Sequence, residues 1–261
     1  MLELYYFHGA TCGLKARFTL AEKAVDYKHN IVDRPYLRTE QYKHLNPNSV
    51  VPTLIHQGTV ILESSIIMNY VDDAFDGPQL KPDLPLNRAR MAMWMKKADD
   101  VYLPSIGTVT YTVSMRQKLL QMSDSERKAY LEGIPSEAAR ERRRLSLEMG
   151  FDSPNFAPSI FNLDQMLEDM EASLNRYEWL ADSEYTLADA ALTPFLERLD
   201  ELSFSGLWEE SRPAVTDWWD RIKSRDSYDQ VLGTAPNPER EQHSERGRQA
   251  WTRIKEMLTR H

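Results

Sequence analysis

The stretch that decides the fold is Val50-Val51-Pro52-Thr53-Leu54, followed by Glu63-Ser64-Ser65 eleven residues after Pro52. Proline has no N–H to give to a strand ladder, so a Val-Pro pair at the head of an apolar run is unusual in a central strand. The pair suits a cis-proline turn that points the backbone of Val51 outward, where its N–H and C=O can pair with an extended peptide. We therefore expect Val51 and Pro52 to form a peptide-binding edge.

The second part of the motif, Glu63-Ser64, follows a short β-prone run at residues 60–62 and opens an apolar segment. This order predicts a helix that begins at Ser64. The start of a helix presents free N–H groups and a partial positive charge, which suits a ligand carboxylate. Glu63 can accept a hydrogen bond from an ammonium group, and Ser64 can donate one to a carboxylate. The motif predicts a receptor for a small acidic peptide, and a simple helix cap is the alternative.

Composition excludes several classes of protein. The chain has 261 residues and a formal net charge of −8, which argues against a nucleic-acid partner. No apolar run approaches the ~18 residues of a membrane span, and the first ten residues lack the basic region of a signal peptide. Cys12 is the only cysteine, which excludes an internal disulfide and fits a reducing compartment. We expect a cytoplasmic protein without a membrane partner. The six histidines show no paired ligand spacing, so no metal site is expected.

Residues 1–76 predict a compact βαβ–ββα domain that resembles thioredoxin. Apolar residues at Leu14, Phe18, Ala21 and Val25 are four, three and four positions apart, a spacing typical of a helix. The predicted strands are 2–7, 27–32, 53–55 and 60–62, and the other predicted helices are 39–45 and 64–74. The expected fold class is therefore an α/β N-terminal domain followed by a different second domain.

Residues 77–86 form the expected linker, since glycine and three prolines interrupt a polar run there. Everything from 87 to 261 looks helical, which predicts an all-α C-terminal domain. The predicted helices are 88–115, 123–131, 137–149, 161–175, 187–202 and 214–224. The charged tail, 239–261, has one apolar face at helical spacing. We expect it to fold back onto the domain, with a partner-facing helix as the alternative.

Thr186 and Asp189 have the spacing of a capping box at the start of an almost wholly apolar helix. Together with Val51-Pro52, Glu63-Ser64 and the proline-rich linker, this order of features resembles the glutathione S-transferase superfamily over essentially the whole chain. The resemblance implies that the Val51 backbone pairs with the cysteinyl part of glutathione. It also implies that Glu63 and Ser64 hold the γ-glutamyl end of this cosubstrate.

The resemblance places the chemistry at the turn after the first strand, where Thr11 and Cys12 stand. Thr11 would donate a hydrogen bond to the glutathione thiolate, helped by the dipole of the first helix. Cys12 would instead form or reduce a mixed disulfide with glutathione. The stretch 9–14, Gly-Ala-Thr-Cys-Gly-Leu, resembles the Gly-Ala-Cys-Ser-Leu turn of beta-class enzymes with one residue inserted. We favour Thr11, with Cys12 close behind and a packed bystander Cys12 as the third interpretation.

A narrower resemblance lies in the helical half, at residues 121–126, 133–135 and 142–144. These segments are similar to the inserted segment of bacterial glutathione-dependent β-aryl etherases, and related dehalogenases carry a similar insert. The resemblance implies that glutathione thiolate cleaves the β-aryl ether bond of lignin-derived dimers, giving a thioether and a phenol. The serine that etherases use has no clear counterpart here. The expected substrate-pocket residues on helix 88–115, each with core packing as the alternative, are Tyr102, Ile106, Thr110 and Tyr111.

Several interpretations stay open. Arg140 and Arg142–Arg144 could place a cation at the mouth of the pocket, but the interleaved glutamates favour a solvated helix face. The functional alternatives are a glutathione-dependent thiol reductase, lyase or dehalogenase that uses Cys12, and a non-catalytic carrier or interaction protein. The superfamily resemblance also implies a dimer with an identical chain or with a paralogue.

Overall fold

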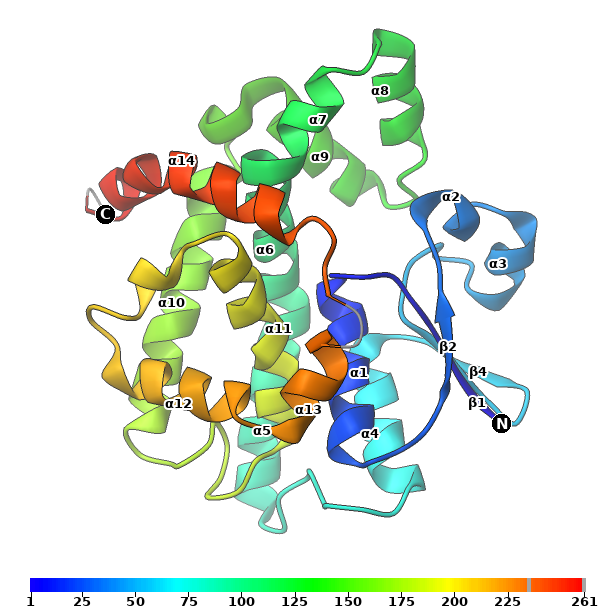
Figure 1. Ribbon diagram of the computed structural model, residues 1–261, viewed down its shortest axis with the longest axis vertical. Helices are drawn as coiled ribbons and strands as arrows, with labels where there is room; N and C mark the ends of the chain where they lie inside the picture. The colour runs from blue at the N-terminus through cyan, green and yellow to red at the C-terminus, as the bar shows by residue number, and fades with distance from the viewer. Residues whose placement is uncertain (234–235, 260–261) are drawn as a thin grey trace.

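The computed structural model describes residues 1–233 and 236–259, which form a small sheet domain followed by a helical domain (Figure 1). The sheet has the strand order β2-β1-β3-β4. β1 (Leu2–Tyr6) pairs in parallel with β2 (Lys28–Ile31) and antiparallel with β3 (Thr53–His56), which pairs antiparallel with β4 (Thr59–Ile61). This mixed sheet is the thioredoxin-like arrangement that the sequence predicted.

Two helices, α1 (Thr11–Glu22) and α4 (Ser64–Ala74), cover one face of the sheet. Leu2, Leu4 and Tyr6 alternate along β1 and are buried against apolar residues of both helices. The shorter helices α2 (Arg34–Leu37) and α3 (Glu40–Leu45) follow β2. α2 was not predicted from the sequence, although Asp33 caps it by accepting from the Tyr36 N–H at 2.9 Å.

The second domain contains helices and, among the described residues, no strand. Its α-helices are α5 (Pro85–Lys97), α6 (Leu103–Thr110), α7 (Arg116–Leu120), α8 (Asp124–Glu132), α9 (Glu137–Met149), α10 (Phe156–Leu174), α11 (Leu187–Glu201), α12 (Pro213–Lys223), α13 (Asp226–Tyr228) and α14 (Arg240–Thr259). π-helical turns at Ala98–Tyr102 and Tyr111–Met115 join α5, α6 and α7 into one long run. This run extends beyond both ends of the helix predicted at 88–115. α10 begins five residues before the predicted position, at Phe156.

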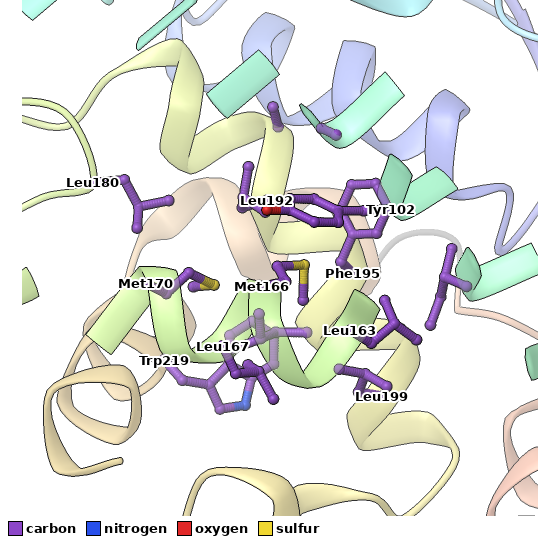
Figure 2. Packing of buried hydrophobic residues seen from close by; sticks show 14 of the residues in the cluster. Tyr102, Leu163, Met166, Leu167, Met170, Leu180, Leu192, Phe195, Leu199 and Trp219 are labelled. Atoms are coloured by element: carbon purple, nitrogen blue, oxygen red, sulfur yellow. The ribbon is translucent and has the colours of Figure 1, made fainter. Parts of the chain in front are cut away.

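α11 is the central helix, and almost all of its residues are buried. Figure 2 shows Leu192, Phe195 and Leu199 of α11 facing Leu163 and Met166 of α10. The predicted capping box is present at the start of this helix. Asp189 accepts hydrogen bonds from the Thr186 N–H and hydroxyl at 3.0 Å, from the Leu180 N–H at 3.0 Å and from Trp218 Nε1 at 2.9 Å. One carboxylate therefore connects the start of α11, the loop that contains Leu180 and the helix α12 that contains Trp218.

The tail helix α14 lies against the body of the helical domain (Figure 1). His243, Gly247, Ala250 and Ile254 form its buried face. A Cβ at Gly247 would lie 1.7 Å from the carbonyl oxygen of Leu202, so only glycine permits this close approach. The last two residues of the predicted tail lie outside the described residues. Within the described part of the chain, no helix is both long and apolar enough to cross a membrane.

Candidate functional site

The turn after β1 leads directly into α1, whose first residue is Thr11. The first helical hydrogen bond runs from the Leu14 N–H to the Ala10 carbonyl at 2.9 Å. The N–H groups of Thr11, Cys12 and Gly13 therefore have no partner within the helix. The Thr11 hydroxyl is half-buried, and in the part of the chain that the structure describes it has no hydrogen-bond partner. The start of α1 can thus offer a hydroxyl and a positive dipole to an anion.

Cys12 lies beside Thr11 but its thiol is already engaged. The half-buried Sγ donates to the Val51 carbonyl at 3.0 Å. Burial raises the pKa of Cys12 above its ordinary value, although the positive charge of Lys15 opposes this. Cys12 is therefore a thiol, not a thiolate, at neutral pH.

We expect iodoacetamide to alkylate Cys12 more slowly at pH 8 than it alkylates cysteine in an unstructured peptide. The thiolate is the reacting species, and the raised pKa keeps its fraction small. The alkylation rate should rise as the pH passes above the pKa of an ordinary thiol. Mass spectrometry of the intact chain gives the rate. Alkylation faster than that of the peptide would contradict this assignment of Cys12.

The Val51–Pro52 peptide bond is cis, as the sequence predicted. Asn46 supports this turn, since its Nδ2 donates to the Val50 carbonyl at 2.9 Å and to Thr53 Oγ1 at 3.0 Å. The Val51 N–H has no backbone partner among the described residues. Its carbonyl differs from the expectation, because it already accepts the Cys12 thiol. The N–H of Val51 is therefore the group that can pair with a bound peptide.

The Glu63-Ser64 motif begins α4, as predicted, in an unusual backbone conformation. Glu63 has φ +66° and is exposed, while Ser64 is buried. Positive φ costs energy in a residue with a side chain, and such residues cluster at functional sites. Glu63 makes no side-chain cap of α4, so the simple cap is not what the structure shows. Among residues 1–233 and 236–259 its carboxylate has no partner, so it is available to an ammonium group.

Lys15 connects these parts of the site. Its fully buried Nζ donates to Ser65 Oγ at 2.8 Å and to Asp99 Oδ1 at 2.5 Å. Ser65 belongs to the first turn of α4, whereas Asp99 belongs to the helical domain. Lys15 thus ties α1, α4 and the second domain together. This role of Lys15 was not predicted, although a lysine among the apolar residues of a helix is a recognisable signal in a sequence.

We expect Lys15→Met to lower the free energy of unfolding by about 2 kcal/mol. The substitution leaves Asp99 without its cation, but the carboxylate is about one-third exposed, so water limits the cost below the usual 3–5 kcal/mol. The same substitution in an Asp99→Asn background should cost roughly 1 kcal/mol less, and urea unfolding of all four proteins measures this coupling. If Lys15→Met costs the same in the wild-type and the Asp99→Asn protein, the Lys15–Asp99 ion pair does not stabilise the contact between the two domains.

A cavity of about 330 Å³ adjoins this site through Asp99. Leu103, Pro104, Gly107 and Thr108 form one wall, while Arg142 and Arg143 of α9 contribute to the other. A Cβ at Gly107 would meet nothing within 4 Å, which is consistent with open space beside the helix. The cavity has apolar surface for a ring and polar groups at its margins, as ligand pockets do.

None of the four expected substrate residues is among those that line this cavity. Tyr102 and Ile106 are 3% and 2% exposed and belong to the core, where Tyr102 lies beside Phe195 (Figure 2). Tyr111 is buried in a separate cluster near Tyr130, and half-buried Thr110 is not among the residues that line the cavity. The structure therefore assigns the cavity wall to positions adjacent to the predicted ones, because the helix faces the core with residues 102 and 106.

The arginine run divides into two kinds of residue. Arg144 pairs with Glu141 at 2.6 Å and with Glu148 at 2.5 Å, and Arg140 donates to the Ile134 carbonyl at 2.9 Å. Arg144 therefore matches the glutamate-paired, solvated face that the sequence favoured, whereas Arg140 is half-buried against a backbone carbonyl. Arg142 and Arg143 line the cavity instead. Among the described residues, no group of three or more His, Cys, Asp or Glu side chains could hold a metal ion.

Comparison with known proteins identifies the family. The model of the glutathione S-transferase N-terminal domain matches residues 11–74, and the model of the C-terminal domain matches residues 162–226. The chain belongs to the glutathione S-transferase superfamily. Its cosubstrate is accordingly glutathione. The thioredoxin-like and helical domains are those of this superfamily, as the sequence predicted.

Among curated relatives, Protein LigF of Sphingobium sp. is 28% identical over 86% of this chain and 90% of its own length. The tetrachloro-p-hydroquinone reductive dehalogenase of Sphingobium chlorophenolicum is 27% identical over 87% and 94%, respectively. The crystal structure of β-etherase LigF from Sphingobium sp. superposes with a TM-score of 0.80 at 26% identity. It covers 89% of this chain and 99% of that one. This chain is similar to a β-etherase and to a dehalogenase over nearly all of its length.

Proposed function

We propose that this transferase uses glutathione thiolate to attack a hydrophobic aromatic electrophile, and that the preferred reaction is cleavage of a β-aryl ether in a lignin-derived dimer. The thiolate forms a C–S bond at the carbon that bears the aryl ether, while the C–O bond breaks and a phenolate leaves. The thiol proton passes to solvent, so the reaction needs no oxidant or reductant. The similarity to β-etherase LigF supports this choice of reaction.

The observation that carries the proposal is the cavity lined by Asp99, which two hydrogen bonds of Lys15 connect to Ser65, the residue that follows the Glu63-Ser64 glutathione motif. In this arrangement the Val51 N–H pairs with the cysteinyl part of glutathione. Glu63 accepts from its ammonium group, and Ser64 at the start of α4 meets its α-carboxylate. The sulfur then lies towards the start of α1, from which it can attack the ether-bearing carbon of a substrate whose aromatic ring occupies the cavity.

Thr11 has the role of thiolate stabiliser in this proposal. Its hydroxyl has no partner among the described residues, so it is available to a bound sulfur. The Cys12 thiol, in contrast, already donates its hydrogen bond to the Val51 carbonyl. Thr11 acts by donating a hydrogen bond, because a threonine hydroxyl is too weak a base to remove the thiol proton.

A second candidate is a Cys12-dependent reductive reaction on an aromatic halide, since one similar protein is a reductive dehalogenase. The position of Cys12 in the first turn of α1 supports it. The raised pKa of Cys12 weighs against a resting thiolate nucleophile. We therefore place this reaction second.

The proposed reaction is tested by incubating the protein with glutathione and an aryl-ether dimer that releases a coloured phenol. Mass analysis should find a glutathione thioether in an amount equal to the phenol released. Oxidised glutathione in place of the thioether, lost on Cys12→Ala, would support the reductive alternative. Neither product with any aryl ether or halide would leave a non-catalytic carrier as the better description.

We further propose that the protein is a homodimer in the cytoplasm, with a heterodimer with a paralogue as the alternative. Large apolar side chains are exposed on α4, on the linker and on α5, namely Ile66, Leu84, Leu86 and Met93. Covering such side chains would stabilise a dimer. Light scattering during size-exclusion chromatography should give twice the chain mass, and the mass of one chain would refute this part of the proposal.

A further inference from the structure

The cavity next to the glutathione motif has one basic wall. Arg142 and Arg143 of α9 both line it. Arg142 has no ion pair or hydrogen bond in the part of the chain that the structure describes. Arg143 lies over the Tyr111 ring at 3.9 Å, and its Nη1 donates a long hydrogen bond, 3.4 Å, to the Gly107 carbonyl. Neither guanidinium has a carboxylate partner among the described residues.

Unlike Arg142 and Arg143, two charged residues close to them do have partners of opposite charge. Arg144 is two residues from Arg142, yet it is held by two glutamates on the outer face of α9. Asp99 is the only carboxylate among the residues that line the cavity, and Lys15 already neutralises it. Burial lowers the pKa of Arg143, Tyr130 and Tyr111 oppose this shift, and the nearby charge of Arg142 adds to it. The cavity therefore has an excess of positive charge without a protein anion to balance it.

A guanidinium that is half-buried without a carboxylate binds an oxyanion well, because its planar fork donates two parallel hydrogen bonds. Across the cavity, Leu103 and Pro104 give apolar surface for a ring, and Gly107 leaves open space. The arrangement fits an aromatic ring that carries an acidic group at the end away from the reacting carbon.

We propose that Arg142 and Arg143 anchor a carboxylate or phenolate of the electrophile, so that the transferase prefers anionic aromatic ethers to neutral ones. This inference rests on the proposed glutathione transfer and adds the substrate class. Arg142 is the main anchor because it has no other partner in the described structure. Arg143, which is held by Tyr111 and Gly107, supplies a second charge of fixed position.

The test uses two substrates that differ in one charge. Both are α-(para-nitrophenoxy)acetophenones, one with a carboxylate at the para position of the acetophenone ring and the other with its methyl ester. Their leaving group is the same, so release of para-nitrophenolate gives comparable kcat/KM values. We expect the acid to be preferred. Arg142→Gln should lower the ratio of acid to ester by about 10- to 100-fold, the loss typical of a charged hydrogen bond.

Arg144→Gln is the matched control, because Arg144 lies on the same helix but outside the cavity. It should leave the acid-to-ester ratio unchanged. Arg142→Lys should restore part of the preference, since a lysine keeps the charge but not the fork. An equal fall for acid and ester on Arg142→Gln, or no preference in the wild-type protein, would overturn the inference. A raised KM for glutathione with an unchanged ratio would overturn it too, by assigning Arg142 to the cosubstrate.

Binding measurements separate this inference from the proposed reaction. If neither compound yields a thioether, the proposed ether cleavage fails. Calorimetric titration of the acid and the ester into the protein with glutathione still tests the anchor. Tighter binding of the acid that Arg142→Gln abolishes supports it, and equal affinities for acid and ester refute it.

Discussion

Asp189→Ala is expected to lower the free energy of unfolding by about 3–5 kcal/mol, the usual cost of removing one partner from a buried charged network. The buried carboxylate accepts four hydrogen bonds, from the Thr186 N–H and hydroxyl, the Leu180 N–H and Trp218 Nε1. Alanine would leave these donors without a partner in the core, and each such group is costly. Urea unfolding followed by tryptophan fluorescence measures the change.

Two variants separate the network from the helix cap. Thr186→Val removes the cap hydroxyl but keeps the carboxylate, and it should cost about 1 kcal/mol. Asp189→Asn keeps one acceptor oxygen, so its cost should fall between those of the other two. A loss below about 1 kcal/mol for Asp189→Ala would show that α11 is held by apolar packing alone.

Thr11→Val is expected to lower kcat/KM at pH 7 by about 10- to 100-fold. A hydrogen bond to a charged acceptor is worth roughly 1.5–3 kcal/mol, which corresponds to about one to two pH units in the pKa of the bound thiol. Donation to the thiolate lowers that pKa, and valine removes the donor. The rate of the variant should therefore recover as the pH rises above the ordinary thiol range. The pH dependence of thioether formation measures this shift.

The controls distinguish Thr11 from its neighbour. Thr11→Ser keeps the hydroxyl and should retain most of the activity and the wild-type pH profile. Cys12→Ala should retain thioether formation, because the thiol of Cys12 donates to the Val51 carbonyl. An unchanged pH profile for Thr11→Val, combined with loss of activity for Cys12→Ala, would transfer the role to Cys12.

The parts of the structure that the sequence predicted are those with local signals. The cis turn at Val51, the start of α4 at Ser64 and the capping box of α11 each depend on residues a few positions apart. Proline chemistry, helix capping and apolar periodicity act over that range. The order of these signals was sufficient to give the superfamily and the fold class.

What the sequence did not predict depends on contacts between distant residues. Lys15 meets Asp99 across 84 positions, and nothing in either segment indicates its partner. The face of the α5–α7 run that meets the core could not be predicted because π-helical turns at 98–102 and 111–115 shift the helical phase. The cavity is therefore lined by Leu103 and Gly107, the neighbours of the predicted Tyr102 and Ile106. Likewise, the way α9 packs decides that Arg142 lines the cavity while Arg144 pairs with Glu141, and the run of arginines in the sequence does not distinguish them.

We propose that the Val51 N–H and the Glu63-Ser64 start of α4 hold one molecule of glutathione. Titration calorimetry of the purified protein with glutathione tests it directly. We expect saturable heat with one glutathione for each chain, and about tenfold weaker binding for Ser64→Ala because a charged hydrogen bond is lost. If the wild-type protein gives no heat at millimolar glutathione, these residues do not form a glutathione site.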